Sequence, residues 1–160
     1  MVKIKKILLG ISLGLISNIS FAQCYIMGDS IAQGVAQNMR VCSSATKVGL
    51  NTNQAKQYWV DNNILHKQPV QDLTVISLGV NDGNAQTLEN LVKIRANLKS
   101  KRIVWILPPK KQKSDIVERI ANHYNDYMLE INPVLGKDGI HPTGQGYQAI
   151  AQKIKKFHIK

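Results

Sequence analysis

The stretch Tyr25-Ile26-Met27-Gly28-Asp29-Ser30-Ile31-Ala32 decides how the rest of the chain is interpreted. An apolar run ends at a glycine, an Asp-Ser pair follows, and apolar residues then recur at every fourth position (Ile31, Val35, Met39). This pattern predicts a strand, a tight turn and a helix, with Ser30 at the turn. Ser30 is then either the N-cap of the helix or a nucleophile, because a helix N-terminus offers free N–H groups and a positive dipole end to a developing oxyanion.

Predicted strands and helices alternate along the chain. Further strands are expected over 40–46, 73–78, 102–107 and, although it contains Pro133, 129–134. Helical patterns cover 53–60, where Ala55, Tyr58 and Trp59 are expected to face inward, and three later stretches that start near Leu88, Ile116 and Tyr147. Near-continuous apolar strands alternating with helices predict a parallel sheet that is covered on both faces.

Three polar or glycine positions follow predicted strands directly. Ser30, Gly49 and Asn81 each come just after a strand. Because ligands of such folds bind beyond the carboxyl ends of the strands, this convergence favours the functional interpretation of Ser30.

The first 22 residues have the form of a secretory signal. Lys3, Lys5 and Lys6 precede a broken apolar stretch over 7–19, and Ser20-Phe21-Ala22 resembles a cleavage site. The apolar stretch is too short for a permanent anchor, which needs roughly 20 residues. We therefore expect a signal over 1–22, one domain over 23–160, no membrane segment after cleavage and a secreted or periplasmic location. A lipoprotein attached through Cys24 is disfavoured, because Gln23 stands where a small residue is needed.

The two cysteines of the chain, Cys24 and Cys42, both lie in the expected mature protein. In an oxidising compartment an isolated pair favours a disulfide, and neighbouring strands could bring the two residues together. A metal site is disfavoured because neither cysteine belongs to a Cys-x-x-Cys or Cys/His cluster.

The chain is strongly basic. Its formal charge is +11, and removal of the three signal lysines leaves +8. Lys110, Lys111 and Lys113 follow the strand-ending Pro108-Pro109 and should therefore lie at the same sheet edge as Ser30. The lysines either form an ordinary solvated face or attract an anionic polymer. A nucleic-acid partner is disfavoured by the export signal and by the lack of a binding motif.

A second polar motif, Asp138-Gly139-Ile140-His141-Pro142, precedes the last predicted helix. An Asp and a His three residues apart on a loop can bond to each other, which fixes the imidazole tautomer and leaves its other nitrogen available. His141 could then remove the proton from a serine hydroxyl, which is a weak nucleophile without an adjacent base.

Four short motifs thus occur in order. They are Gly28-Asp29-Ser30, Gly49, Gly79-x-Asn81-Asp82 and Asp138-x-x-His141-Pro142. Together they resemble the four blocks of the SGNH (GDSL) hydrolase family, and the resemblance covers essentially the whole mature chain. It implies a flavodoxin-like, three-layer α/β/α sandwich with a mostly parallel five-stranded sheet, and no metal or organic cofactor.

The resemblance also implies roles for individual residues. Ser30 would be the nucleophile, His141 the general base and then acid, and Asp138 its partner. The oxyanion hole would consist of the backbone N–H groups of Ser30 and Gly49 and the side-chain amide of Asn81. The block at Gly49 departs from the family pattern, because Leu50-Asn51-Thr52 follows it in place of glycine and small residues.

Three further expectations concern the surroundings of these motifs. Asp29 and Asp82 are expected to hold turns through side-chain to backbone hydrogen bonds. The mature chain is short for the family, which implies trimmed loops and an open, shallow site. Trp59 and Trp105 are expected in the core.

The sequence therefore predicts a secreted serine esterase that acts through an acyl-enzyme. An open site, a basic surface and export favour removal of O-acetyl groups from a glycan, and a small ester would also be a substrate. A lysophospholipase or thioesterase of the same family is the alternative enzyme. A catalytically silent envelope-binding protein is the alternative of another class, although Ser30, Asn81 and His141 are all present.

Overall fold

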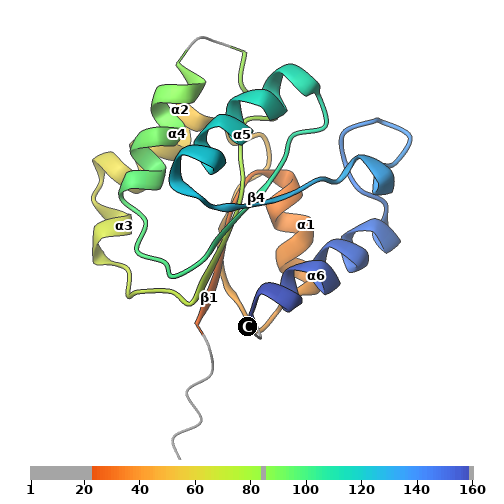
Figure 1. The fold of residues 1–160 in the computed structure, drawn as a ribbon, viewed down its shortest axis with the longest axis horizontal. Helices are drawn as coiled ribbons and strands as arrows, with labels where there is room; N and C mark the ends of the chain where they lie inside the picture. The colour runs from red at the N-terminus through yellow and green to blue at the C-terminus, as the bar shows by residue number, and fades with distance from the viewer. Residues whose placement is uncertain (1–22, 84–85, 159–160) are drawn as a thin grey trace, which may run out of the picture.

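A five-stranded, fully parallel sheet forms the centre of the molecule (Figure 1). The computed structural model describes residues 23–83 and 86–158, so the predicted signal over 1–22 lies outside the described residues. The strands are β1 (Cys24–Gly28), β2 (Ser43–Thr46), β3 (Leu73–Ser77), β4 (Ile103–Ile106) and β5 (Tyr127–Leu129). Their order is β2-β1-β3-β4-β5, and all four pairings are parallel. This is the flavodoxin-like order, as predicted.

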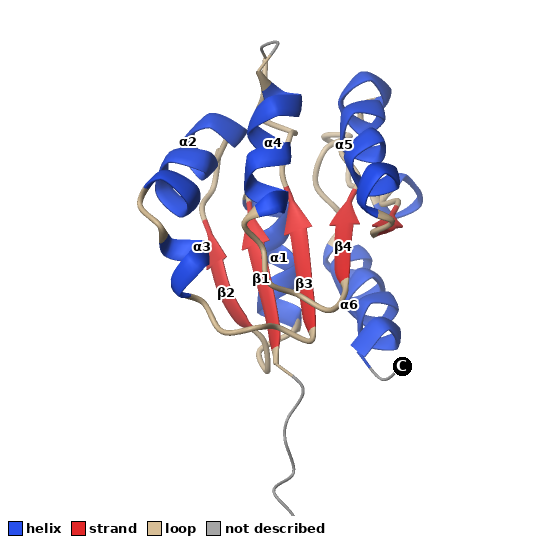
Figure 2. Cartoon of the chain, turned by 60° about the vertical axis from the view of Figure 1, so that its left-hand side comes forward, coloured by secondary structure: helices blue, strands red, loops and turns tan. Residues whose placement is uncertain are grey.

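Helices cover both faces of the sheet (Figure 2). They are α1 (Ser30–Asn38), α2 (Thr52–Lys56), the π-helical η1 (Gln57–Asp61), α3 (Ile64–Lys67), α4 (Thr87–Ala96), α5 (Lys111–Tyr124), the 3₁₀-helical η2 (Asn132–Val134) and α6 (Gly144–His158). The α1 and α6 helices pack on one face, and α2 to α5 pack on the other. The predicted three-layer α/β/α architecture is confirmed.

Alternation along the strands divides the core into these two layers. In β1, Ile26 packs with the α1 and α6 side, whereas Tyr25 and Met27 pack with the opposite side. All five residues of β1 and of β3 are buried, because these strands lie inside the sheet. Trp59 and Trp105 are 2% and 0% exposed, as expected for core residues.

The last strand is displaced from its predicted position. The strand expected over 129–134 is instead β5 (Tyr127–Leu129), and the segment around Pro133 is the 3₁₀ helix η2. Proline has no N–H to donate to a sheet, which explains why pairing stops before it. The helix expected over 53–60 starts at Thr52 and widens into a π-helix. Tyr58 does not face inward there but is 58% exposed.

A disulfide joins Cys24 and Cys42. Cys24 opens β1, whereas Cys42 lies immediately before β2 and not within it. The bond therefore ties the start of β1, an interior strand, to the turn that follows α1.

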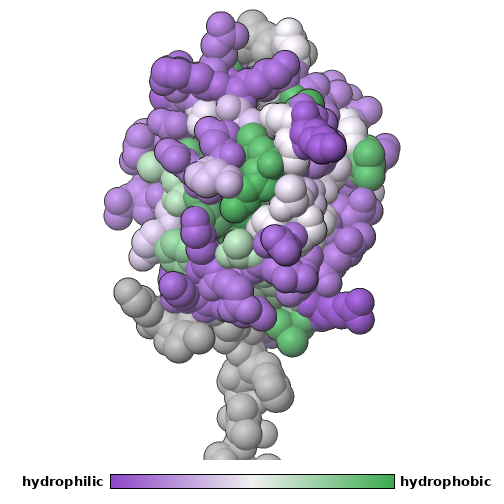
Figure 3. Space-filling model, turned by 90° about the vertical axis from the view of Figure 1, so that its right-hand side faces the viewer, coloured by the Kyte–Doolittle hydropathy of each residue, from purple (hydrophilic) through white to green (hydrophobic). Residues whose placement is uncertain are grey.

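The face that carries α6 is hydrophilic around its rim, with apolar residues gathered in its middle (Figure 3). Within the described part of the chain, no helix combines the length and the apolar character needed to cross a membrane.

Candidate active site

The turn between β1 and α1 exposes Ser30. Gly28 has φ of +140°, and a Cβ at this position would lie 1.9 Å from the carbonyl oxygen of Ser77. Only glycine allows so close an approach of the two backbones. The N-cap of α1 is Asp29, whose Oδ1 accepts from the N–H groups of Ile31 and Ala32 at 3.0 and 3.5 Å. The N-cap interpretation of Ser30 is therefore wrong: Ser30 is the first residue of the helix.

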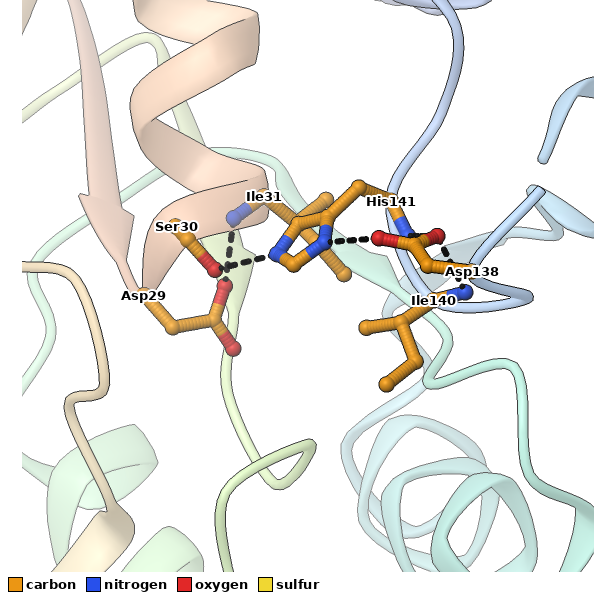
Figure 4. A network of polar contacts seen from close by, with 6 residues as sticks. All are labelled: Asp29, Ser30, Ile31, Asp138, Ile140 and His141. Carbon is orange, nitrogen blue, oxygen red and sulfur yellow. Dashed lines mark hydrogen bonds and ion pairs between the residues drawn. The ribbon is translucent and has the colours of Figure 1, made fainter. Parts of the chain in front are cut away.

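Ser30, His141 and Asp138 form one line of hydrogen bonds (Figure 4). The Ser30 Oγ lies 2.9 Å from His141 Nε2, and His141 Nδ1 lies 2.7 Å from Asp138 Oδ2. Because an ionised carboxylate can only accept, Nδ1 carries a hydrogen, and Nε2 of the neutral ring accepts from the Ser30 hydroxyl. A serine thus contacts a base, and a carboxylate orients that base.

Several hydrogen-bond donors stabilise the ionised form of Asp138. Its Oδ1 accepts from the backbone N–H groups of Ile140 and His141 at 3.0 and 2.9 Å. The Ile140 bond, the His141 ring and the His141 backbone bond lower the pKa of Asp138 to about 2. The Asp138 carboxylate is therefore ionised in neutral solution.

The loop that carries His141 is fixed to its neighbours. The Gly136 N–H donates to the His141 carbonyl at 2.7 Å, and Leu135 pairs with Pro142 in an antiparallel bridge. The site is nevertheless open, because the side chains of His141 and Asp138 are 43% and 51% exposed. This agrees with the shallow site expected from the short chain.

Asp29 lies in the opposite environment. It is fully buried, its Oδ1 also accepts from the Ser77 hydroxyl at 3.0 Å, and its Oδ2 has no partner among the described residues. Burial raises the pKa of Asp29 to about 6, even though these hydrogen bonds act to lower it. As expected, the Asp29 side chain holds a turn.

The turns after β1, β2 and β3 are hydrogen-bonded to one another. Lys47 N–H donates to the Gly28 carbonyl at 3.0 Å, and Asp29 N–H donates to the Ser77 carbonyl at 3.0 Å. The Asn81 side-chain amide donates to the Leu50 carbonyl at 3.1 Å. Asn81 therefore lies beside the segment that contains Gly49, which is exposed and has φ of +72°.

Asp82 anchors a different segment from the expected one. Its carboxylate accepts from the backbone N–H of Thr52 at 3.1 and 3.2 Å and from the Thr52 hydroxyl. It thus fixes the N-terminus of α2, 30 residues away, and so joins the loops that carry Gly49 and Asn81.

The three lysines after Pro108-Pro109 differ from one another in their contacts. Lys111 pairs with Asp115 at 2.9 Å, and the Lys113 ammonium donates to the Val80 carbonyl. Two of the three charges are therefore engaged within the protein.

Three contributors to the site have no local signal in the sequence. Ser77 bonds to Asp29, Lys113 holds the residue before Asn81, and Tyr147 packs its ring against Gly34 of α1. Burial raises the pKa of Tyr147, and the carboxylates of Asp29 and Asp138 add to the rise. Sequence separations of 33 residues or more between the bonded pairs explain why the motifs did not reveal these residues.

Metal ligands do not gather around this site. Within residues 23–83 and 86–158, no three His, Cys, Asp or Glu side chains are arranged to hold a metal ion.

Comparisons with known proteins identify the fold. Neither a protein-family model nor a curated protein matches the sequence. Among solved structures, a GDSL-like lipase from Bacteroides thetaiotaomicron has a TM-score of 0.60 at 21% identity, over 84% of this chain and 88% of that one. A lipolytic G-D-S-L family protein from Veillonella parvula has a TM-score of 0.64 at 15% identity, over 84% and 96%.

A third structure is the catalytic domain of peptidoglycan O-acetyltransferase A from Streptococcus pneumoniae, solved with a methylsulfonyl adduct. Its TM-score is 0.56 at 18% identity, over 84% of this chain and 90% of that one. These similarities agree with the strand order and with the resemblance of the four motifs. The chain has the fold of the SGNH (GDSL) hydrolases.

Proposed function

We propose that this protein is a serine ester hydrolase of the SGNH type. The observation that carries the proposal is the hydrogen-bonded line from Ser30 through His141 to Asp138, at 2.9 and 2.7 Å. This arrangement has the parts that acyl transfer needs: a nucleophile, a base that contacts it, and a carboxylate that orients the base. The fold shared with lipases and acylhydrolases supports the same reaction class.

The first half of the reaction forms an acyl-enzyme. His141 Nε2 removes the Ser30 proton while Oγ attacks the ester carbonyl, and Asp138 stabilises the imidazolium that results. The carbonyl oxygen becomes an oxyanion between the backbone N–H groups of Ser30 and Gly49 and the amide of Asn81. The imidazolium then gives its proton to the leaving alcohol oxygen as the ester C–O bond breaks.

The second half releases the acid. Water loses a proton to His141 as it attacks the acyl-Ser30 carbonyl, and the proton returns to Oγ as the acid leaves. Because the Asn81 amide nitrogen carries two hydrogens, it can donate to Leu50 and still present one to the oxyanion.

We further propose that the substrate is an O-acetylated glycan outside the cytoplasm. The open site favours a bulky substrate with a small acyl group. The N-terminal segment has signal features, and a disulfide suits an oxidising compartment. Acetyl chemistry on a glycan also occurs on this fold in the peptidoglycan O-acetyltransferase.

The test is a comparison of wild-type protein with Ser30→Ala on p-nitrophenyl esters of increasing chain length and on O-acetylated glycans. We expect acetate to be the preferred acyl group and the variant to lose at least about 10³-fold in kcat, because the nucleophile is absent. Far-UV circular dichroism should show the same fold for both proteins. Turnover by Ser30→Ala close to that of the wild type would refute the proposal, and a preference for long acyl chains would favour the lipid alternative.

A further inference from the structure

A pocket of about 400 Å³ lies between the end of β2 and the helices α2 and η1. Its volume is within the range of about 300–1,000 Å³ that is typical of small-molecule sites. Lys47 and Leu50 contribute to its wall and flank Gly49 in the sequence. The pocket therefore lies beside the segment that contains Gly49 of the proposed oxyanion hole.

The backbone connects this pocket directly to Ser30. Thr46, which lines the pocket, pairs with Gly28 in the sheet, and Gly28 is followed by Asp29 and Ser30. On the other wall, Leu50 accepts the hydrogen bond of Asn81. A substrate whose ester lies at Ser30 can thus extend into the pocket across the segment 47–50.

The lining is mainly apolar and aromatic and includes three polar residues. Trp59 is buried, whereas its neighbour Tyr58 is 58% exposed, and their rings meet edge to face with centroids 6.5 Å apart. The π-helical turn of η1 lets these two consecutive residues both line the pocket. Ala45 and Leu50 add apolar surface, and Thr46, Lys47 and Gln54 are the polar residues of the lining. The Gln54 Oε1 accepts from the Asn51 N–H at 3.4 Å, so its amide nitrogen is the group that can donate to a ligand.

The exposed aromatic ring and the three polar residues of this lining are features of a sugar-binding site. The C–H face of a sugar packs on an aromatic ring, while its hydroxyl groups bond to amide, hydroxyl and ammonium groups.

We propose that the pocket lined by Tyr58, Gln54 and Lys47 binds a sugar ring of the substrate, next to the ring whose ester is cleaved at Ser30. This inference rests on the proposed esterase function and names the substrate class that the site selects. Tyr58 supplies the packing surface, and the polar side chains supply the donors.

The kinetic test uses Tyr58→Ala, the conservative Tyr58→Phe and a control, Tyr127→Ala. Tyr127 is 48% exposed on β5 and does not line the pocket. The substrates are p-nitrophenyl acetate and a chemically O-acetylated trisaccharide of N-acetylglucosamine. We expect Tyr58→Ala to lower the ratio of kcat/KM for the trisaccharide to that for p-nitrophenyl acetate about tenfold, mainly through KM. Tyr58→Phe and the control should keep the wild-type ratio.

Two kinetic results would overturn the inference. An equal loss on both substrates would show a structural role for Tyr58. A changed preference among p-nitrophenyl acetate, butyrate and octanoate, with the trisaccharide unaffected, would make the pocket an acyl-chain site.

A binding measurement separates this inference from the proposed function. The unacetylated trisaccharide is titrated calorimetrically into Ser30→Ala protein and into the Ser30→Ala/Tyr58→Ala double variant. We expect binding to the first and about tenfold weaker binding to the second, which corresponds to about 1.4 kcal/mol. If the wild type hydrolyses no ester but this difference is found, the esterase proposal fails and the sugar site stands. If esters are hydrolysed and the two titrations agree, the sugar site alone fails.

Discussion

Two aspartates of the active-site region have the same side chain and opposite environments. Asp29 is the N-cap of α1 and is fully buried, whereas the side chain of Asp138, in the loop before α6, is 51% exposed. Burial raises the pKa of Asp29 to about 6, while hydrogen bonds lower the pKa of Asp138 to about 2. Both lie in the network of Figure 4, on either side of the Ser30–His141 contact.

The difference follows from how many donors each carboxylate receives. Both oxygens of Asp138 accept hydrogen bonds, and one partner is the imidazole that becomes positively charged in the proposed mechanism. One oxygen of Asp29 has no partner among the described residues, and the other holds the start of α1 and Ser77. The comparison assigns electrostatic support of His141 to Asp138 and positioning of the Ser30 turn to Asp29.

Replacement of Asp138 should give the largest effect. Asp138→Asn keeps the shape but presents an amide that can donate to His141 Nδ1, which favours the wrong tautomer. We expect kcat to fall about 10⁴-fold, as a loss of this kind does in serine hydrolases. Steady-state kinetics on p-nitrophenyl acetate measures it. Asp29→Asn is the matched control, because asparagine is also a good N-cap, and kcat should fall less than about tenfold. Similar losses in the two variants would contradict the division of roles.

The pH dependence of stability should distinguish Asp29. A carboxyl group whose pKa is higher in the folded protein binds its proton more tightly when folded, so its contribution to stability is lost as the pH rises. We expect this contribution to decline between about pH 4 and pH 6, by about 3 kcal/mol in total. The measurement is urea unfolding of the wild type and Asp29→Asn at pH 4, 5, 6 and 7. The difference in free energy of unfolding should shift in favour of the variant as the pH rises, and a constant difference would disprove the raised pKa.

Lys113 offers a third and smaller test. It supports the turn before Asn81 through a flexible, positively charged side chain, whereas Asp29 supports the Ser30 turn through a buried carboxyl group. Its ammonium donates to the carbonyl of Val80, next to Asn81. Lys113→Met should loosen the placement of Asn81 and lower kcat about tenfold, less than the about 10²–10³-fold that loss of an oxyanion donor costs. Lys111→Met, which removes only an exposed pair with Asp115, is the control and should leave kcat unchanged. Equal losses of kcat in the two variants would contradict this role of Lys113, because surface charge alone would then explain the loss.

Local sequence patterns were sufficient to predict the parts of the fold that depend on burial. The apolar runs of β1 and β3 are interior strands, and the glycine and polar residues that follow them form the turns of the site. The sequence predicted that Ser30, His141 and Asp138 lie close together. The two motifs that contain them stand near opposite ends of the expected domain and resemble those of a known family. The placement of Gly49 and Asn81 on adjacent loops could also be predicted, because each follows a strand of the parallel sheet and these strands end at the same edge.

Other features depend on contacts that no local pattern contains. β5 has three residues, two of them exposed, so its alternation is too short to locate it against the apolar residues that follow. Tyr58 was expected to face the core because its spacing fits a regular α-helix. In the π-helix η1 the number of residues per turn differs, and the Tyr58 side chain faces solvent instead. The partners of Asp82 and Lys113 lie 30 and 33 residues away.

The central claim is that Ser30 carries the acyl group, and covalent labelling tests it most directly. The protein is treated with phenylmethylsulfonyl fluoride and analysed by intact-mass and peptide mass spectrometry, with His141→Ala as a matched variant that keeps the serine. The account predicts one sulfonyl adduct, on the peptide that contains Ser30, and much slower labelling of His141→Ala because the base is absent. Labelling of another residue, or equal labelling rates in both proteins, would contradict it.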